Sequence, residues 1–500
     1  MSDANSIESQ PLVWSNRFAT LGEDFLTHLQ PTPLPETYWI HKNQQLLHTF
    51  GWPAEGLNSP DALLAFSGCA IPEDAKPFAS VYSGHQFGVW AGQLGDGRAI
   101  TLGEVDSALG LQEIQLKGAG PTPYSRRGDG RAVLRSSIRE YLCSEAMHGL
   151  GIPTTRALCL TGSPQPVRRE EIETAAVVTR TAPSFLRFGH FEHFSSNGQT
   201  TQLQKLAVHA LAEHLPECKV RASAGEHNGN IYAVMLQTVC DRTAHMVAQW
   251  QAVGFCHGVM NTDNMSILGL TLDYGPFQFL DGFNPRHICN HTDSQGRYAY
   301  HRQPNVAYWN LFCLGQALAP LINDQDLTVS VLETYKSSFP MALDQAMGRK
   351  LGIVDRALTD QLLQLMAKEQ VDYPVFWRQL SHAVLALGEQ TGCEASAWTV
   401  VRDLFLDRPA WDLWQKDYLR ALGEHDVRLV GQSMLANNPK FVLRNHLAEI
   451  AIRKAKSGDF FEIDTLMTLL QSPFDEHPGY EAYAQLPPAW ASSIEISCSS

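Results

Sequence analysis

The stretch HGVMNTDNMSILGLTLDYG, residues 257–275, carries the most specific chemical pattern in this sequence. It begins at His257, has the unreactive Val259 two positions later, and places Asn264 five residues after that valine. It ends with Asp273, a tyrosine and Gly275. Amide and carboxylate oxygens are ligands that suit Mg²⁺, so Asn264 and Asp273 are candidate metal ligands.

The same order of residue types occurs in the catalytic centre of protein kinases, with one difference. Kinases read His-Arg-Asp, then Asn five residues after that Asp, then Asp-x-Gly. Here Val259 stands where the catalytic Asp would be. Asp263 is the carboxylate in this loop that could replace the missing base, although an Asp in such a loop is often only a turn former. The stretch indicates either an inactive kinase or an enzyme that uses its nucleotide in another way.

A lysine and a glutamate further upstream fit the same scheme. In IQLK, Ile114 and Leu116 alternate with polar residues, which predicts a strand with Lys117 on the opposite face. Glu140 follows in an amphipathic helix predicted for residues 130–150. Kinases pair a strand Lys with a helix Glu and so hold the ammonium over the phosphates. Two unrelated solvated charges are the plain alternative, but the order of the motifs favours a functional pair.

Two glycine-rich stretches flank this strand, AGQLGDGR (91–98) and LKGAGPTPYSRRGDGRA (116–132). Glycines let backbone N–H groups approach a phosphate closely, whereas an isolated Asp-Gly is more often a hairpin turn. Two cation-bearing Gly-Asp-Gly-Arg turns around one strand favour phosphate binding. The candidates in these stretches are Gly92, Gly95, Gly97, Arg98, Gly118, Gly120, Arg126, Arg127, Asp129, Gly130 and Arg131.

Two arginines lie in or just after an apolar segment. Arg180 interrupts AAVVTRTA (175–182), which otherwise predicts a buried strand, and Arg187 follows in SFLRFGH. A buried arginine needs an anionic partner, which is usually a protein carboxylate. A phosphate is the functional alternative, because the planar guanidinium recognises it well.

The order of predicted elements indicates an α+β, two-lobed, protein-kinase-like fold. Residues 1–75 are predicted to be an N-terminal extension with short helices, and residues 76–330 the two-lobed nucleotide-binding core. Helices are expected at 201–216 and 240–255. Residues 331–500, where apolar residues recur mainly at helical spacing, are predicted to form a helical region on the larger lobe.

Composition excludes several classes of protein. The chain has 500 residues, 44% hydrophobic and 18% charged, with a formal net charge of -14. Such an acidic chain is a poor general nucleic-acid binder, and no apolar run is long enough to predict a membrane span. The polar N-terminus lacks the pattern of a signal peptide, and the ten cysteines show no metal-type spacing. A cytoplasmic location is therefore expected.

With these motifs assembled, the sequence resembles the selenoprotein O family, also called YdiU, over nearly its whole length. Members of this family are kinase-like protein adenylyltransferases. The resemblance is carried by long strings, namely GHQFGVWAGQLGDGRAI, LKGAGPTPYSRRGDGRAVLRSSIREYL, GIPTTRAL, VVTRTAPSFLRFGHFE, HGVMNTDNMSILGLTLDYGPFQFLD, NPKFVLRNH and the terminal CSS.

The resemblance implies a role for each candidate residue. ATP would lie inverted relative to ordinary kinases, with its β- and γ-phosphates among Lys117, Arg180 and Arg187. Asp263 would take the proton from a Ser, Thr or Tyr hydroxyl of a protein substrate, and AMP would be transferred with release of pyrophosphate. The remaining implied contacts are Gly95, Gly97, Arg98, Asp129, Gly130 and Asp273 for the nucleotide, and Asn264 and Asp273 for Mg²⁺ or Mn²⁺.

Two alternatives stay open at this point. A true kinase with a displaced base would transfer the γ-phosphate instead, and a non-catalytic scaffold would only bind ATP. The resemblance also places Cys498 where some members carry selenocysteine. Our hypothesis is that Cys498 is redox active and pairs with another cysteine such as Cys289. An idle exposed thiol is the alternative.

Overall fold

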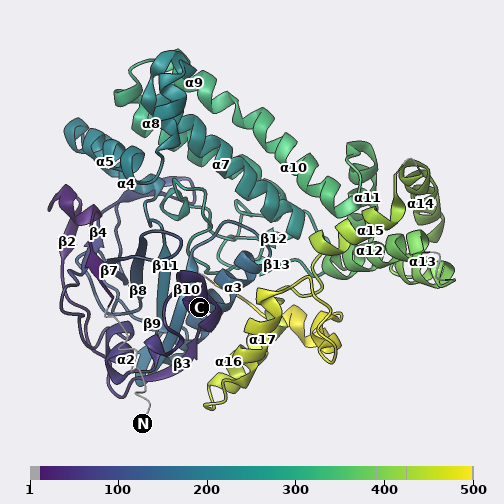
Figure 1. Cartoon of the computed structure of the whole chain (residues 1–500), viewed down its shortest axis with the longest axis horizontal. Coiled ribbons are helices and arrows are strands. Elements are labelled where there is room, and N and C mark those ends of the chain that lie inside the picture. Colours follow the sequence, from purple (N-terminus) through teal and green to yellow (C-terminus); the bar gives the residue numbers. More distant parts are fainter. Residues whose placement is uncertain (1–11, 390–391, 424, 498–500) are drawn as a thin grey trace, which may run out of the picture.

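An antiparallel nine-stranded sheet occupies the first part of the chain (Figure 1). We describe it from a computed structural model, which covers residues 12–389, 392–423 and 425–497. Seven strands follow one another in the order β2-β4-β7-β8-β11-β10-β3, while β1 pairs with β7 and β9 with β11. Their bounds are β1 Trp14–Ser15, β2 Leu26–His28, β3 Tyr38–Lys42, β4 Phe78–Ser80, β7 Ala99–Val105, β8 Gln112–Lys117, β9 Ala132–Val133, β10 Arg156–Arg168 and β11 Ile172–Ala182.

Strand β8 confirms the alternation expected for Ile114 to Lys117. All six residues of β8 are buried, because both faces of the sheet are covered. Ile114 and Leu116 join the hydrophobic cluster formed with helices α1 (Gln44–Phe50) and α2 (Pro60–Phe66). Gln115 and Lys117 therefore face the opposite side, where Arg180 of β11 lies directly across from Gln115.

The predicted N-terminal extension contains the short helices α1 and α2, as expected, but it also supplies strands. Strands β1, β2 and β3 all lie before residue 76 and pair with β7, β4 and β10 respectively. These strands are two to five residues long, too short to produce a readable periodicity. Residues 14–42 thus form part of the sheet.

Helix α3 (Leu134–Gly149) lies across β10 and β11 and carries Glu140 toward the sheet. Beyond the sheet, the long helix α7 (Ile231–Val253) packs against α8 (Gln303–Ile322) and α10 (Tyr335–Leu351). The other helices here are α4 Phe188–Ser196, α5 Thr200–Glu213, α6 Glu217–Ser223 and α9 Gln325–Glu333. Two small hairpins complete this part, β5 Ser83–Gln86 with β6 Val89–Gln93, and β12 Phe255–Cys256 with β13 Gln278–Phe279.

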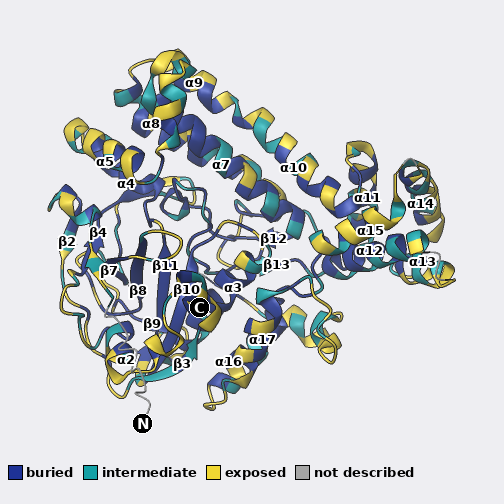
Figure 2. Cartoon of the chain, in the orientation of Figure 1, coloured by how far each residue is buried: buried dark blue, intermediate teal, exposed yellow. Residues whose placement is uncertain are grey.

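The helical last third divides into two groups. Helices α11–α15 belong to a second hydrophobic cluster, which also includes residues of α10 and of the segment 280–300, and their outer faces are exposed in Figure 2. Helices α16 and α17 instead pack on α3, which belongs to the sheet side of the molecule. The bounds are α11 Arg356–Glu369, α12 Tyr373–Glu389, α13 Glu394–Arg402, α14 Arg408–Leu422, α15 Val427–Asn437, α16 Asn445–Ala455 and α17 Phe461–Gln471.

The structure confirms the predicted class, a mixed α/β fold with a sheet-rich N-terminal region and a helical C-terminal region. None of its described helices combines the length and the apolar character needed to cross a membrane. Cys498 lies outside the described residues. The chain just before it returns to the segment that holds Cys289, since the His291 N–H donates to the Ile496 carbonyl at 3.1 Å.

Candidate active site

A cavity of about 660 Å³ lies between the sheet and the 257–275 stretch. Every nucleotide, metal and base residue implied by the family resemblance lines it. They are Gly95, Gly97, Arg98, Lys117, Asp129, Gly130, Arg180, Arg187, Asp263, Asn264 and Asp273. Residues up to 178 positions apart in the chain are thus brought to one site.

The predicted pair between the strand lysine and the helix glutamate is present. Lys117 Nζ lies 2.6 Å from Glu140 Oε2, and both side chains are almost fully buried. The same ammonium donates to Asp273 Oδ1 at 2.9 Å. Burial lowers the pKa of Lys117, while Asp273 and Glu140 act in the opposite direction. The lysine is therefore held at the end of its strand between two carboxylates.

Both predicted buried arginines contact the Asp273 carboxylate. Arg180 Nη1 donates to Glu140 Oε1 at 2.9 Å and also to Asp273. Arg187 pairs with Asp273 Oδ2 and donates to the backbone carbonyl of Asp263 at 2.6 Å. Lys117, Arg180 and Arg187 therefore lie around Glu140 and Asp273, so these five side chains together carry one more positive than negative charge.

Asp273 is the common partner of this cation cluster, which we define as Lys117, Arg180 and Arg187. Burial by itself would raise the pKa of Asp273, but the three cations outweigh it and hold the pKa well below its usual range. The residue adopts a left-handed backbone conformation with φ of 56°. It stays ionised, and it occupies the cations that a phosphate group would otherwise contact.

Asp263 has the environment of a general base. Its side chain is buried, and Gln86 Nε2 donates to its Oδ2 at 3.2 Å. Its other oxygen, Oδ1, has no hydrogen-bond partner among the described residues. Burial raises the pKa of Asp263 to about 6, with Arg187 opposing the shift. A carboxylate with a raised pKa and a free oxygen can accept a proton near neutral pH.

Asn264 is oriented by the residue that replaces the kinase Asp. Its Nδ2 donates to the Val259 carbonyl at 3.0 Å, so its amide oxygen is the atom left to contact a cation. Together with the ionised Asp273 in the same cavity, it offers the oxygen donors that Mg²⁺ prefers. The donor set thus fits the predicted metal.

Each of the two glycine-rich loops has a position that requires glycine, because a Cβ there would overlap neighbouring atoms. Gly130 has φ of +66°, and a Cβ there would lie 2.1 Å from the carbonyl of Gly120. Gly95 has φ of +137°, and a Cβ would lie 2.4 Å from the ring of Tyr124. No other residue type fits either position without displacing the loop.

The sequence did not predict Gln86 or Arg169 as part of the site. Arg169 forms two hydrogen bonds with the Asp129 carboxylate, at 2.7 and 2.9 Å, and lines the cavity. Gln86 belongs to GHQFG, part of one of the strings that carry the family resemblance. That string was the sequence feature that could have identified Gln86 as a site residue. His190 Nδ1 accepts a hydrogen bond from the backbone N–H of Arg187 at 3.0 Å.

Comparison with known proteins identifies the family of this chain. The family profile described as "Protein adenylyltransferase SelO" matches residues 9–471. A protein of Albidiferax ferrireducens, named protein nucleotidyltransferase YdiU, is 58% identical over 498 residues, covering 98% of this chain and 97% of its own. A protein of the same name from Variovorax paradoxus is 57% identical over 495 residues, with coverage of 98% and 97%. The kinase-like chain described here belongs to the SelO family of protein adenylyltransferases.

Proposed function

We propose that this protein transfers AMP from ATP to Ser, Thr or Tyr hydroxyls of other proteins, and that pyrophosphate is released. The observation that carries this proposal is the cation cluster, set deep in a cavity whose wall also holds the buried base Asp263. The cluster by itself suits any phosphate group. Membership of the SelO family favours the orientation in which the β- and γ-phosphates lie among the cations.

In the proposed reaction, Asp263 Oδ1 accepts the proton of the acceptor hydroxyl. The hydroxyl oxygen then forms a bond to the α-phosphorus, and the bond between that phosphorus and the α,β-bridging oxygen breaks. The electron pair leaves with pyrophosphate. The developing charge on the leaving group is stabilised by Lys117, Arg180 and Arg187, which are already fixed by their carboxylate partners.

Mg²⁺ or Mn²⁺ would be held by Asn264 and Asp273. When bound, such an ion would neutralise part of the negative charge of the phosphates. Gly95, Gly97, Arg98, Asp129 and Gly130 would line the remainder of the nucleotide.

The test uses ATP labelled at either the α- or the γ-phosphate, with divalent metal and an added mixture of acceptor proteins. Protein-bound label is measured for the wild type, and Asp273→Ala serves as the inactive control. We expect label from α-labelled ATP only. Label from γ-labelled ATP only would identify a kinase with a displaced base. Label from neither, together with measurable ATP binding, would identify a scaffold.

A further inference from the structure

A second groove of about 700 Å³ opens beside the nucleotide cavity. One wall is the β5–β6 hairpin, which contributes Phe87 and Val89. The opposite wall is formed by the segment that follows the Asp-Tyr-Gly motif and by the start of α8, including Arg297, Arg302 and Trp309. None of these residues belongs to the nucleotide site described above.

The hairpin connects this groove directly to the candidate base. Gln86 donates to Asp263 at 3.2 Å, and the next residue, Phe87, donates its backbone N–H to Asn261 Oδ1 at 3.1 Å. Tyr298 also donates to Asn261 Oδ1, at 2.6 Å, and its ring contacts that of Phe87. Gln86 therefore contacts the candidate base Asp263, and the next residue, Phe87, lines the groove.

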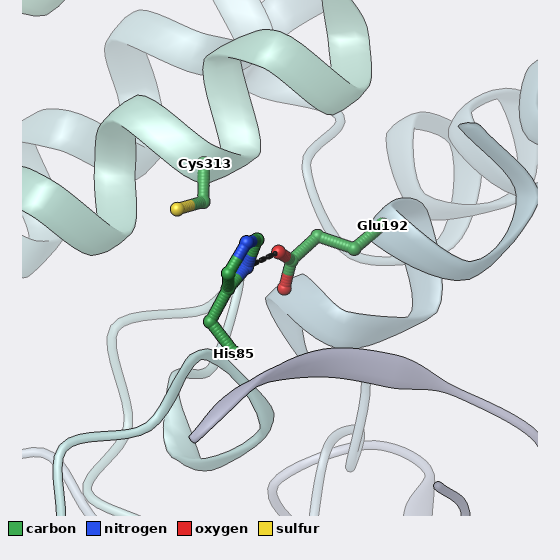
Figure 3. A group of neighbouring side chains, drawn as sticks. All are labelled: His85, Glu192 and Cys313. Carbon is green, nitrogen blue, oxygen red and sulfur yellow. Dashed lines mark hydrogen bonds and ion pairs between the residues drawn. The ribbon is translucent and has the colours of Figure 1, made fainter. Parts of the chain in front are cut away.

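A pair formed by the partly exposed His85 and the buried Glu192 anchors the hairpin (Figure 3). His85 Nδ1 lies 2.6 Å from Glu192 Oε1 of α4, and Cys313 of α8 is their neighbour. The His85 N–H donates to Thr262 Oγ1 at 2.8 Å, and the His85 ring contacts Trp309 at 5.2 Å between centroids. Because the hairpin is tied to α4, to α8 and to the base-bearing loop, the groove is a preformed feature.

The groove carries positive charge in an otherwise acidic chain. The Arg297 guanidinium stacks on Trp309 at 4.7 Å and abuts the hairpin turn, where a Cβ on Gly88 would lie 2.7 Å from Arg297 Cζ. Within the described part of the chain, neither Arg297 nor Arg302 forms an ion pair, and Arg302 donates only to backbone carbonyls. The groove carboxylate Asp293 is buried and accepts from two backbone N–H groups.

Apolar side chains are exposed next to these cations. Phe87 is 39% exposed, Val89 70% and Trp90 42%, all on one short hairpin. Large exposed apolar residues that cluster beside unpaired arginines are typical of surfaces that bind other proteins. A free phosphate or a metal ion would have no use for this apolar wall, whereas a polypeptide segment would contact both features.

We propose that this groove binds the segment of the protein substrate that flanks the acceptor hydroxyl, and that Arg297 and Arg302 select segments with acidic side chains near that hydroxyl. This inference rests on the proposed function, because it takes the substrate to be a protein. The bound segment would lie along Phe87 and Val89, so that the hydroxyl enters the nucleotide cavity past Gln86 and reaches Asp263.

The experiment measures fluorescence anisotropy of two labelled peptide pools with the full-length protein. Both pools carry Ser, Thr or Tyr at the centre, flanked by Asp and Glu in one pool and by Lys and Arg in the other. The variants are Arg297→Glu and Arg302→Glu. The second is included because Arg297→Glu also removes the contact with Trp309, which could affect folding. Arg420→Glu, at a 71% exposed side chain on α14, is the matched control.

We expect the wild type and Arg420→Glu to bind the acidic pool at least about tenfold more tightly than the basic pool. Arg297→Glu and Arg302→Glu should lose that preference while keeping the wild-type melting profile. Equal binding of both pools by the wild type, or an unchanged preference in both groove variants, would overturn the proposal. Equally tight, Arg297-dependent binding of a single-stranded oligonucleotide would also overturn it, because the groove would then recognise any polyanion.

A second readout separates this inference from the proposed function. The same pools are incubated with α-labelled ATP and divalent metal, and transfer of label to peptide is measured. Acidic peptides that bind through Arg297 but receive no label would count against AMP transfer while supporting the groove. Label transferred to both pools at equal rates would support AMP transfer and refute selection by the groove.

Discussion

Asp273→Asn is the substitution that tests the electrostatic description of the site most directly. In the absence of nucleotide, Asp273 pairs with Lys117, Arg180 and Arg187, and its side chain is only 20% exposed. The substitution keeps the shape of the side chain but removes its charge. Lys117 and Arg180 would keep Glu140 as their carboxylate partner, whereas Arg187 would lose its ion pair, so the net charge of these side chains would rise from +1 to +2.

Removing one partner of a buried ion pair typically costs about 3–5 kcal/mol, because the other charge is left uncompensated. We therefore expect Asp273→Asn to lower the stability of the nucleotide-free protein by about that amount. For a cooperative unit of 150–250 residues this corresponds to a melting temperature lower by roughly 10 °C. The pKa of Asp273 is held low, so this stability is present at neutral pH and is lost as the pH falls through the folded-state pKa.

The assay is thermal unfolding without divalent metal, with and without inorganic pyrophosphate. Pyrophosphate would replace the missing carboxylate, so we expect it to raise the melting temperature of Asp273→Asn more than that of the wild type. Asp417→Asn, which breaks an exposed pair with Arg420 on α14, is the control and should change stability by less than about 1 kcal/mol. The reasoning fails if Asp273→Asn melts with the wild type, or if pyrophosphate stabilises both proteins equally.

Three further outcomes are expected. Asp263→Asn should slow AMP transfer by about 10²–10⁴-fold with little change in ATP affinity, measured by calorimetry, and transfer at the wild-type rate would disprove the base assignment. Gly130→Ala should weaken ATP binding and lower the melting temperature, because its Cβ meets backbone at 2.1 Å, and unchanged affinity would show that the loop is adaptable. Burial lowers the pKa of Lys350 to about 7, although Nζ donates to Asn438 Oδ1 at 2.8 Å. Between pH 7 and 10 the unfolded wild-type chain therefore binds more protons than the folded chain, so the wild type loses stability as the pH falls. Relative to the wild type, the free energy of unfolding of Lys350→Met, measured by urea titration, should rise by up to about 1.4 kcal/mol for each pH unit of this fall. A difference that does not depend on pH would contradict the lowered pKa.

Local patterns in the sequence were sufficient for much of the fold. The predicted strand at 175–182 is part of β11, and the predicted helix at 130–150 corresponds to α3. These elements could be predicted because their apolar residues recur over many positions. Strands β1–β3 could not, since a strand of two to five residues has no readable period and is stabilised by its neighbours in the sheet.

The sequence alone was sufficient to nominate the reacting groups. Only a short loop separates Asn264 from Asp273, so their closeness in the sequence was enough to predict that they lie close together in space. The sequence also showed that Val259 replaces the acidic residue of the kinase motif and that Asp263 is a nearby carboxylate. These features lie within one loop, so they can be recognised from the sequence without knowledge of the rest of the fold.

Beyond the predicted pair of Lys117 and Glu140, the tertiary structure decided which charges meet. Arg180 and Glu140 come from different elements, and their partnership depends on the packing of α3 across β11. The contact between Gln86 and Asp263 spans 177 positions of the chain. Contacts of this kind arise when the hydrophobic faces of distant elements are buried together. Local patterns along the chain do not reveal these contacts, because they are set by which distant surfaces exclude water from one another.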